Sequence, residues 1–320
     1  MAACISEPAK APPECESAGE RLGGTLESTC RALEYGGRTR TYRIYFPASH
    51  PQPVPLLFVV HGGMGSGSGM ELLTRGQFNR IADRDGVVVV YPDGVGHNWN
   101  DGRPLNSPAA LENVDDVGFL RAIIASVAGE RAIDRGRVFS TGISNGGFMS
   151  FRLACEAADA FAAVAPVSAN LSTVLGPRCQ PSRPVSIAIL NGTDDPIVPW
   201  AGGQVRALGV KRGEVWSAQQ SFEQFLGFDG CRGQRTHDLI DLDPADGTAY
   251  RLHEGTECRD GSAVRLYEIV GGGHTWPHGV QYAGERLVGR VSQEIDATAE
   301  IWAFFAAHGR EGGKSASAAR

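Results

Sequence analysis

The chain alternates short apolar runs with longer helical patterns, and this alternation restricts its possible folds more than any other feature. Pro55 to Val60 (PLLFVV) and Val87 to Tyr91 (VVVVY) are continuous apolar runs, typical of strands buried on both faces of a sheet. Further strands are expected at 39–46, 137–141, 161–167, 185–190 and 264–270, and helices at 71–84, 114–128 (with Asn113 as N-cap), 145–158, 214–226 and 292–307. Strands that alternate with helices of this length require right-handed crossovers. The sequence therefore predicts an α/β fold, a mostly parallel sheet with helices on both faces.

The organisation of the chain indicates one catalytic domain. A leader or linker rich in Pro, Glu, Ala and Gly is expected at 1–28, the domain at 29–308 and a flexible tail at 309–320, with no internal repeat between them. The formal net charge is −6 and no block of Lys and Arg stands out, which argues against nucleic acid as a partner. No apolar run is long enough to cross a bilayer. A monomer without a membrane span is expected.

The seven cysteines are scattered and form no C-x-x-C pair, which favours disulfides in an exported protein over a zinc or redox site. We predict the pairs Cys155–Cys179 and Cys231–Cys258, each closing a loop of about 25 residues and contributing about 3 kcal/mol in the chain-entropy model. Cys15 with Cys30 is a third candidate pair, which leaves Cys4 over. The cysteines thus lead us to expect a secreted or periplasmic location. Residues 1–13 lack the charged and apolar segments of a signal peptide, so none is expected within this sequence.

The strongest chemical signal is Gly142-Ile143-Ser144-Asn145-Gly146-Gly147, which follows a predicted strand and precedes a predicted helix. A G-x-S-x-G sequence in this position is typical of a tight turn that projects a strained serine from the sheet. The helix that begins at Asn145 supplies an unpaired backbone N–H where an oxyanion would form. Ser144 is therefore the predicted nucleophile, and a chance glycine-rich turn is the weaker interpretation.

A serine needs a base to take its proton, and a sheet of this kind requires the chain order serine, acid, histidine. The strand at 185–190 leads into Asp194-Asp195-Pro196, where the proline fixes a turn that can aim the preceding carboxylate. We favour Asp195 as the acid, with Asp194 as the alternative. The last strand ends in three glycines and His274, the predicted base. His278 adds no third ligand to His274, so neither a metal nor another cofactor is expected.

The glycine-rich turn His61-Gly62-Gly63-Met64 follows the first buried strand, where a second oxyanion donor is expected. We favour the N–H of Gly63, with Met64 as the alternative. A phosphate loop is disfavoured because G-x-x-x-x-G-K-[ST] is absent. Three tryptophans are candidate substrate contacts: Trp276 beside the base, Trp200 on a weaker argument, and Trp99, for which a structural role is equally plausible. The acidic residues Asp115 and Asp116 lie in the first turn of a predicted helix and are interpreted as structural.

Six blocks together resemble the polyhydroxybutyrate depolymerase and feruloyl esterase family of α/β-hydrolases, related to carbohydrate esterase family one. These blocks are HGG at 61–63, YPDG at 91–94, DDVGFL at 115–120, GISNGG at 142–147, GTDDPIVP at 192–199 and GGGHTWP at 271–277. The resemblance covers about residues 28–305. It implies that Ser144, Asp195 and His274 form a triad, that Gly63 and Asn145 form the oxyanion hole, and that the protein is disulfide-bonded and exported. The chain departs from the family pattern at Asp194, where a small residue is frequent, and at Trp200, where tyrosine is as common.

The predicted function is therefore a secreted serine esterase that forms an acyl-enzyme. The expected substrates are short-chain hydroxyalkanoate polyesters or feruloyl and acetyl esters of plant polysaccharide, some of them polymeric. A serine peptidase of the same fold is an alternative, disfavoured because the chain has no additional cap or propeller domain. A non-catalytic binding protein on a hydrolase scaffold is a second alternative, disfavoured because all three triad residue types are present.

Overall fold

The computed structural model of the protein describes residues 27–49 and 52–310. Cys4 and Cys15 lie outside these residues, so the third disulfide remains a prediction. Most of the predicted leader and tail also lies outside them, and the boundaries at 28 and 309 likewise remain predictions.

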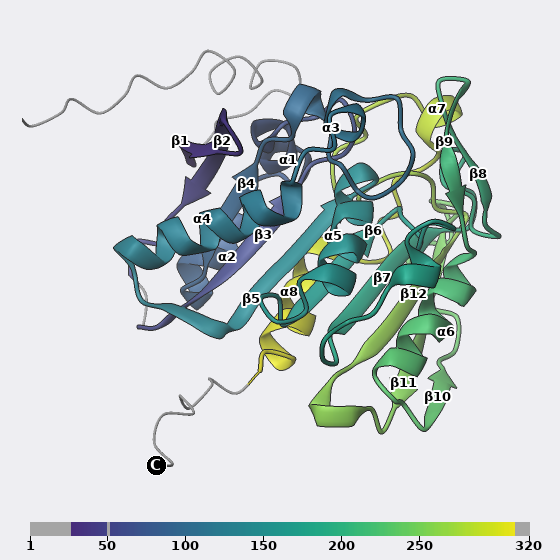
Figure 1. Ribbon diagram of the computed structural model, residues 1–320. Coiled ribbons are helices and arrows are strands. Elements are labelled where there is room, and N and C mark those ends of the chain that lie inside the picture. Colours follow the sequence, from purple (N-terminus) through teal and green to yellow (C-terminus); the bar gives the residue numbers. More distant parts are fainter. Residues whose placement is uncertain (1–26, 50–51, 311–320) are drawn as a thin grey trace, which may run out of the picture.

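A ten-stranded sheet runs through the described part of the chain in the order β1-β2-β4-β3-β5-β6-β7-β12-β11-β10 (Figure 1). Its strands are β1 (Thr29–Tyr35), β2 (Arg38–Tyr45), β3 (Val54–Val60), β4 (Val88–Pro92), β5 (Ile133–Ile143), β6 (Ala163–Val167), β7 (Ser186–Gly192), β10 (Gly233–Thr236), β11 (Ala249–Thr256) and β12 (Val264–Val270). The six central strands, from β4 to β12, are parallel, whereas the pairs at both edges are antiparallel. The carboxyl ends of the parallel strands therefore meet at one edge of the sheet.

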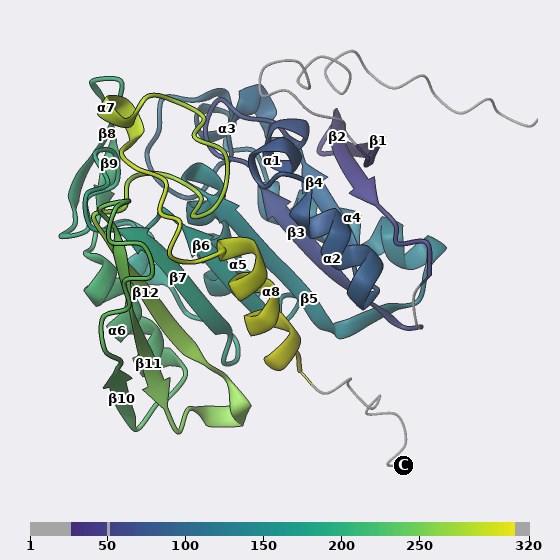
Figure 2. The same cartoon turned by 180° about the vertical axis from the view of Figure 1, so that it is seen from behind.

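Helices cover both faces of the sheet, as the sequence predicts. One face carries α4, α5 and α6, and the opposite face carries α2 and α8 (Figures 1 and 2). The helices are α1 (Gly67–Leu73), α2 (Gln77–Asp85), α3 (Pro108–Leu111), α4 (Asp116–Glu130), α5 (Asn145–Glu156), α6 (Ala218–Phe228), α7 (Glu285–Val288) and α8 (Ala297–Ala307), with 3-10 turns η2 (Val95–His97), η3 (Gly176–Arg178) and η4 (Arg259–Gly261). A small hairpin, β8 (Gly203–Ala207) and β9 (Val210–Val215), stands apart from the sheet.

The side chains of β3 show why this strand sits in the middle of the molecule. All seven of its residues are buried. Leu57 and Val59 belong to the core cluster under α2 and α8, whereas Phe58 and Val60 belong to the cluster under α4 and α5. Each face of such a strand needs a covering layer, because exposing either set would leave large apolar area in water. This arrangement is that of an α/β-hydrolase fold, as predicted.

Two local predictions are wrong. The helix expected at 71–84 is two helices, because Arg75 and Gly76 both adopt left-handed backbone conformations between α1 and α2. The N-cap of α4 is Asp115 instead of Asn113: its carboxylate accepts the Gly118 N–H at 2.8 Å. The structural interpretation of Asp115 agrees with this cap.

Both firmly predicted disulfides are confirmed. Cys155 in α5 pairs with Cys179, and Cys231 pairs with Cys258. Each crosslink joins a helix end on one face of the sheet to a neighbouring loop or strand end, and so limits how far these segments separate in the unfolded chain. No helix among residues 27–49 and 52–310 has the length and apolar character needed to cross a membrane.

Candidate active site

Ser144 lies between the last residue of β5 and the first residue of α5. Its backbone has φ 55° and ψ −121°, a conformation that L-residues rarely adopt. A Cβ atom at Gly142 would lie 2.4 Å from the Val60 carbonyl oxygen, and one at Gly146 would lie 2.1 Å from the same atom. These two glycines are therefore needed for α5 and β3 to pack against the turn. Ser144 is partly exposed although its neighbours on both sides are buried.

The predicted acid and base are in direct contact. Nδ1 of His274 lies 2.7 Å from Oδ2 of Asp195, and both side chains are buried. The other carboxylate oxygen, Oδ1, accepts the N–H groups of Ile197 and Val198 at 2.7 and 2.8 Å. With Nδ1–H donated to the carboxylate, Nε2 of His274 carries a lone pair and can accept a proton.

The alternative acid, Asp194, has a different environment. Its side chain is exposed, and its backbone N–H donates to the Gly272 carbonyl at 3.0 Å. Asp194 therefore connects the loop after β7 to the loop after β12 through its backbone, while its carboxylate accepts the Thr193 hydroxyl at 3.2 Å. The geometry favours Asp195, as the turn at Pro196 predicted.

Close backbone contact brings these two loops together. A Cβ at Gly192 would lie 2.1 Å from the Gly272 carbonyl oxygen, and one at Gly273 would lie 2.3 Å from the Val288 carbonyl oxygen. The Gly271 N–H, in a residue with φ 73°, donates to the Thr193 hydroxyl at 2.9 Å. The glycines before His274 are therefore explained by the close approach of backbone segments on both sides of them.

The end of β6 carries both the serine turn and the histidine loop. The Ser144 N–H donates to the Val167 carbonyl at 2.9 Å, and the hydroxyl of Ser168 donates to the Thr275 carbonyl at 3.3 Å. Residues 167 and 168 are adjacent, so Ser144 and the residue after His274 are anchored one position apart. The three predicted triad residues thus lie at the carboxyl ends of β5, β7 and β12.

The two predicted oxyanion donors are neighbours. A Cβ placed on Gly63 would lie 3.9 Å from the Asn145 Cβ, and one placed on Gly62 would lie 3.5 Å from the Ser144 Cβ. Asn145 is the first residue of α5, and the first N–H groups of a helix have no partner within it. The Met64 N–H donates to the His97 carbonyl at 2.8 Å, so the geometry favours Gly63 over Met64.

His61 fixes the orientation of the peptide that contains the Gly63 N–H, a role that the sequence analysis missed. Nε2 of His61 accepts the Gly94 N–H at 2.9 Å, which puts the ring proton on Nδ1, 2.7 Å from the Gly62 carbonyl oxygen. That carbonyl and the Gly63 N–H belong to the same planar peptide and point in opposite directions. Burial lowers the pKa of His61 and so favours this neutral ring.

The side chain of Asn145 is held by the loop after β4. Its Oδ1 accepts the Trp99 N–H at 2.7 Å, and its Nδ2 donates to Asp101 Oδ2 at 2.6 Å. Asp101 also forms a buried ion pair with Arg103, at 2.6 Å. These bonds fix the start of α5 and hence the direction of the Asn145 backbone N–H. No local sequence pattern marks this contact, because its members lie about 45 residues apart.

The structure corrects two of the three predicted tryptophan contacts. Trp276 is 0% exposed, packs on Phe78 and donates its indole N–H to the Thr298 hydroxyl at 3.0 Å. Trp99 is also 0% exposed and donates its indole N–H to the His61 carbonyl at 3.0 Å. Neither ring reaches a surface from which it could touch a substrate, because both are packed in the apolar core. Trp200 is partly exposed, and its contact with substrate remains a prediction.

Tyr282 is a further residue that sequence reasoning missed. Its hydroxyl donates to the His274 carbonyl at 2.7 Å. Burial, and secondly the charge of Asp195, raise the pKa of Tyr282 above its ordinary value, so the phenol stays protonated and remains a donor. Within residues 27–49 and 52–310, no three His, Cys, Asp or Glu side chains gather as metal ligands would.

The fold is shared with known esterases. An acetyl xylan esterase from Aspergillus awamori superposes with a TM-score of 0.54 at 13% sequence identity, over 87% of this chain and 99% of that one. The chain thus has the α/β-hydrolase fold. No protein-family model matches the sequence.

Two relatives of known name indicate the group of esterases to which the chain is similar. The chain is 29% identical over 277 residues to "Putative esterase NocK" of Nocardia uniformis subsp. tsuyamanensis, covering 84% of this chain and 79% of that protein. It is 31% identical over 226 residues to feruloyl esterase B of Piromyces equi, covering 69% of this chain and 39% of that protein. The chain is therefore related to feruloyl esterases among the α/β-hydrolases, which confirms the family resemblance of its motifs.

Proposed function

We propose that this protein is a serine esterase in which Ser144, His274 and Asp195 form a catalytic triad. The observation that carries the proposal is the buried 2.7 Å contact between His274 and Asp195, together with a strained serine in the strand-to-helix turn. His274 removes the hydroxyl proton as Ser144 Oγ attacks the ester carbonyl. Asp195 holds the ring in the required tautomer and stabilises the imidazolium that forms.

The tetrahedral oxyanion is then stabilised by the backbone N–H groups of Gly63 and Asn145. His274 returns its proton to the departing alcohol, which leaves an acyl group on Ser144. Water repeats the same sequence: it loses a proton to His274, attacks the acyl carbon, and releases the acid and the free serine.

The test of the nucleophile is Ser144→Ala. We expect kcat to fall by several orders of magnitude on p-nitrophenyl acetate, because triad members act as a unit, with an unchanged melting temperature. Labelling of the wild type by a fluorophosphonate, and its loss in the variant, would separate an enzyme from a non-catalytic scaffold protein. Turnover near the wild-type rate in a folded Ser144→Ala protein would refute the assignment.

We propose feruloyl or acetyl esters of plant polysaccharide as the first substrate class, because the named relatives include a feruloyl esterase. Hydroxyalkanoate polyesters are the second class, supported by the sequence blocks around the triad. Parallel assays on methyl ferulate, p-nitrophenyl acetate, hydroxybutyrate oligomers and a peptide amide would rank these classes and test the peptidase alternative. Two disulfides in the described residues support an exported protein.

A further inference from the structure

A second cavity lies away from the serine, between α5, the loop after β4 and the segment around η3. Its volume is about 440 Å³, enough for a sugar-sized molecule. The lining residues include Asn113, Arg152, Glu156, Val174, Leu175 and Arg178. Amides and guanidinium groups next to two aliphatic side chains form a surface suited to a small, hydroxyl-rich anion rather than to an apolar ligand.

The charges around the cavity do not cancel. Arg103 is neutralised by Asp101 at 2.6 Å, and Nε of Arg152 pairs with Glu156 Oε2 at 2.9 Å. Arg178 donates Nε–H to the Val174 carbonyl at 3.0 Å and forms no ion pair with any carboxylate in the described part of the chain. One positive charge is therefore left at the cavity, which matches a monoanion better than a dianion.

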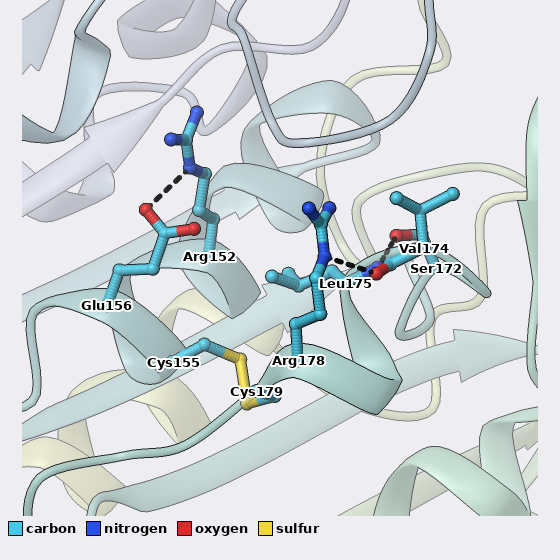
Figure 3. Close-up of a disulfide and its surroundings, with 8 residues drawn as sticks. All are labelled: Arg152, Cys155, Glu156, Ser172, Val174, Leu175, Arg178 and Cys179. Carbon is cyan, nitrogen blue, oxygen red and sulfur yellow. Dashed lines mark hydrogen bonds and ion pairs between the residues drawn. A yellow bond between two sulfur atoms is a disulfide. The ribbon is translucent and has the colours of Figure 1, made fainter.

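The disulfide holds the two arginines of the outer wall in place. Arg178 immediately precedes Cys179, and Arg152 lies one helical turn before Cys155 on α5. Figure 3 shows both guanidinium groups pointing to the same side, away from the sulfur atoms. Because the crosslink fixes η3 against α5, little ordering of this wall is needed when a ligand binds, and binding therefore costs less entropy.

One loop connects this cavity to the proposed oxyanion hole. Asn98 Oδ1 lies 3.2 Å from the position of a Cβ on Gly63, Asp101 holds Asn145, and Asn100 lines the cavity. A group bound in the cavity would thus rest on the segment that also supports the reaction site. This placement suits a polymeric substrate that extends beyond its reacting ester.

We infer that the cavity binds a carboxylated sugar, a uronic acid residue of the polysaccharide whose ester the enzyme cleaves. The inference rests on the proposed function for its polysaccharide, but the cavity and its charge stand independently of the serine. The free guanidinium edge of Arg178 pairs with the carboxylate. Asn100 is buried and donates its amide to Asn113 Oδ1 at 3.1 Å, which leaves the exposed Asn113 Nδ2–H groups to meet the sugar hydroxyls.

Calorimetric titration of the full chain with D-glucuronate, D-glucose, ferulate and inorganic phosphate tests this inference. We expect glucuronate to bind and glucose not to bind. Arg178→Gln should weaken glucuronate binding about tenfold, because a charge-assisted hydrogen bond is lost. Arg235→Gln, an exposed arginine on β10 at the far edge of the sheet, is the matched control and should leave binding unchanged.

Equal binding of glucose, tighter binding of ferulate or phosphate, or glucuronate binding unaffected by Arg178→Gln would each overturn the inference. Hydrolysis of p-nitrophenyl acetate is measured on the same samples and should be unchanged in Arg178→Gln. A protein that cleaves this ester without binding glucuronate disproves only the cavity assignment. One that binds glucuronate without cleaving any ester disproves only the proposed function.

Discussion

The acid–base side and the oxyanion side of the site are held in place by different kinds of contact. On the acid–base side, the loops after β7 and β12 meet through a backbone hydrogen bond and glycines in close approach. Two side-chain contacts add to these, one between Thr193 and the Gly271 N–H and one between Asp195 and His274. On the oxyanion side, the donors are backbone groups, but side chains set their direction. His61 holds the peptide before Gly63, and the loop after β4 holds Asn145.

This difference has a consequence for mutation. Replacing a side chain on the acid–base side removes a reacting or charge-stabilising group. Replacing one on the oxyanion side leaves every proposed donor in the molecule and changes only its direction. The first kind of change should therefore lower kcat far more than the second.

Asp195→Asn should have the largest effect. The amide cannot hold the His274 tautomer or balance its charge, so we expect kcat to fall about 10⁴-fold. Asp194→Asn is the matched control: it keeps the backbone N–H that donates to Gly272 and should leave kcat within a few-fold of wild type. Steady-state kinetics on p-nitrophenyl acetate compare the two. Equal losses would mean that the acid side does not depend on one carboxylate.

His61→Gln should have an intermediate effect. Glutamine can keep an acceptor near the Gly94 N–H but loses the donor to the Gly62 carbonyl, so the Gly63 peptide is less well fixed. We expect kcat to fall about tenfold, less than for complete loss of an oxyanion donor. KM should change little, because the hole contacts developing charge.

His61→Asn is the paired variant, since its amide can replace the donor at Nδ1. It should recover part of kcat while losing stability, because the Gly94 N–H is left without its acceptor. If both variants changed KM and kcat in the same proportion, or if asparagine recovered nothing, His61 would be only a packing residue against Trp99.

The acid–base side could be predicted from the sequence because its constraints are local. The glycines before His274 are needed because backbone segments approach closely there, and Pro196 marks the turn in which Asp195 accepts the Ile197 and Val198 N–H groups. Ser144 is marked in the same way by Gly142 and Gly146. The alternation of strands and helices predicts the parallel centre of the sheet for a similar reason, but it does not fix the order of the strands.

The donors Gly63 and Asn145 were predicted from local patterns, but the side chains that hold them could not be. Asn145 meets Trp99 and Asp101 across the sheet, and such a contact has no spacing rule along the chain. The prediction for Trp276 is wrong because a position close to His274 in sequence does not determine on which side of the loop the ring lies. The ring packs in the core beside Phe78. The edge strands β1, β10 and β11 were missed because they are partly exposed or, in β10, fully exposed, and so lack the continuous apolar run of β3.

Tyr282→Phe should have a smaller effect on catalysis than either His61 variant. The phenol donates one hydrogen bond to the His274 carbonyl. Loss of this bond removes about 1 kcal/mol of the interaction energy that holds the His274 backbone in position. We expect kcat to fall about two- to fivefold with unchanged KM. The shape of the pH–rate profile should remain that of the wild type, because the phenol holds backbone and exchanges no proton. A displaced profile would assign Tyr282 a part in proton transfer.

Asp229→Asn should change stability and leave kcat unaltered, because this residue caps α6 away from both sides of the site. Burial raises the pKa of Asp229 from 3.8 to about 6. The native state therefore binds the Asp229 proton more tightly than the unfolded chain does, and this residue's contribution to stability decreases as pH rises from about 4 to 6.

The Asp229→Asn variant carries no such charge. Its stability relative to wild type should thus be higher at pH 7.5 than at pH 4 by about 2 kcal/mol, measured by urea unfolding at both pH values. An identical difference at the two pH values would mean that Asp229 titrates normally.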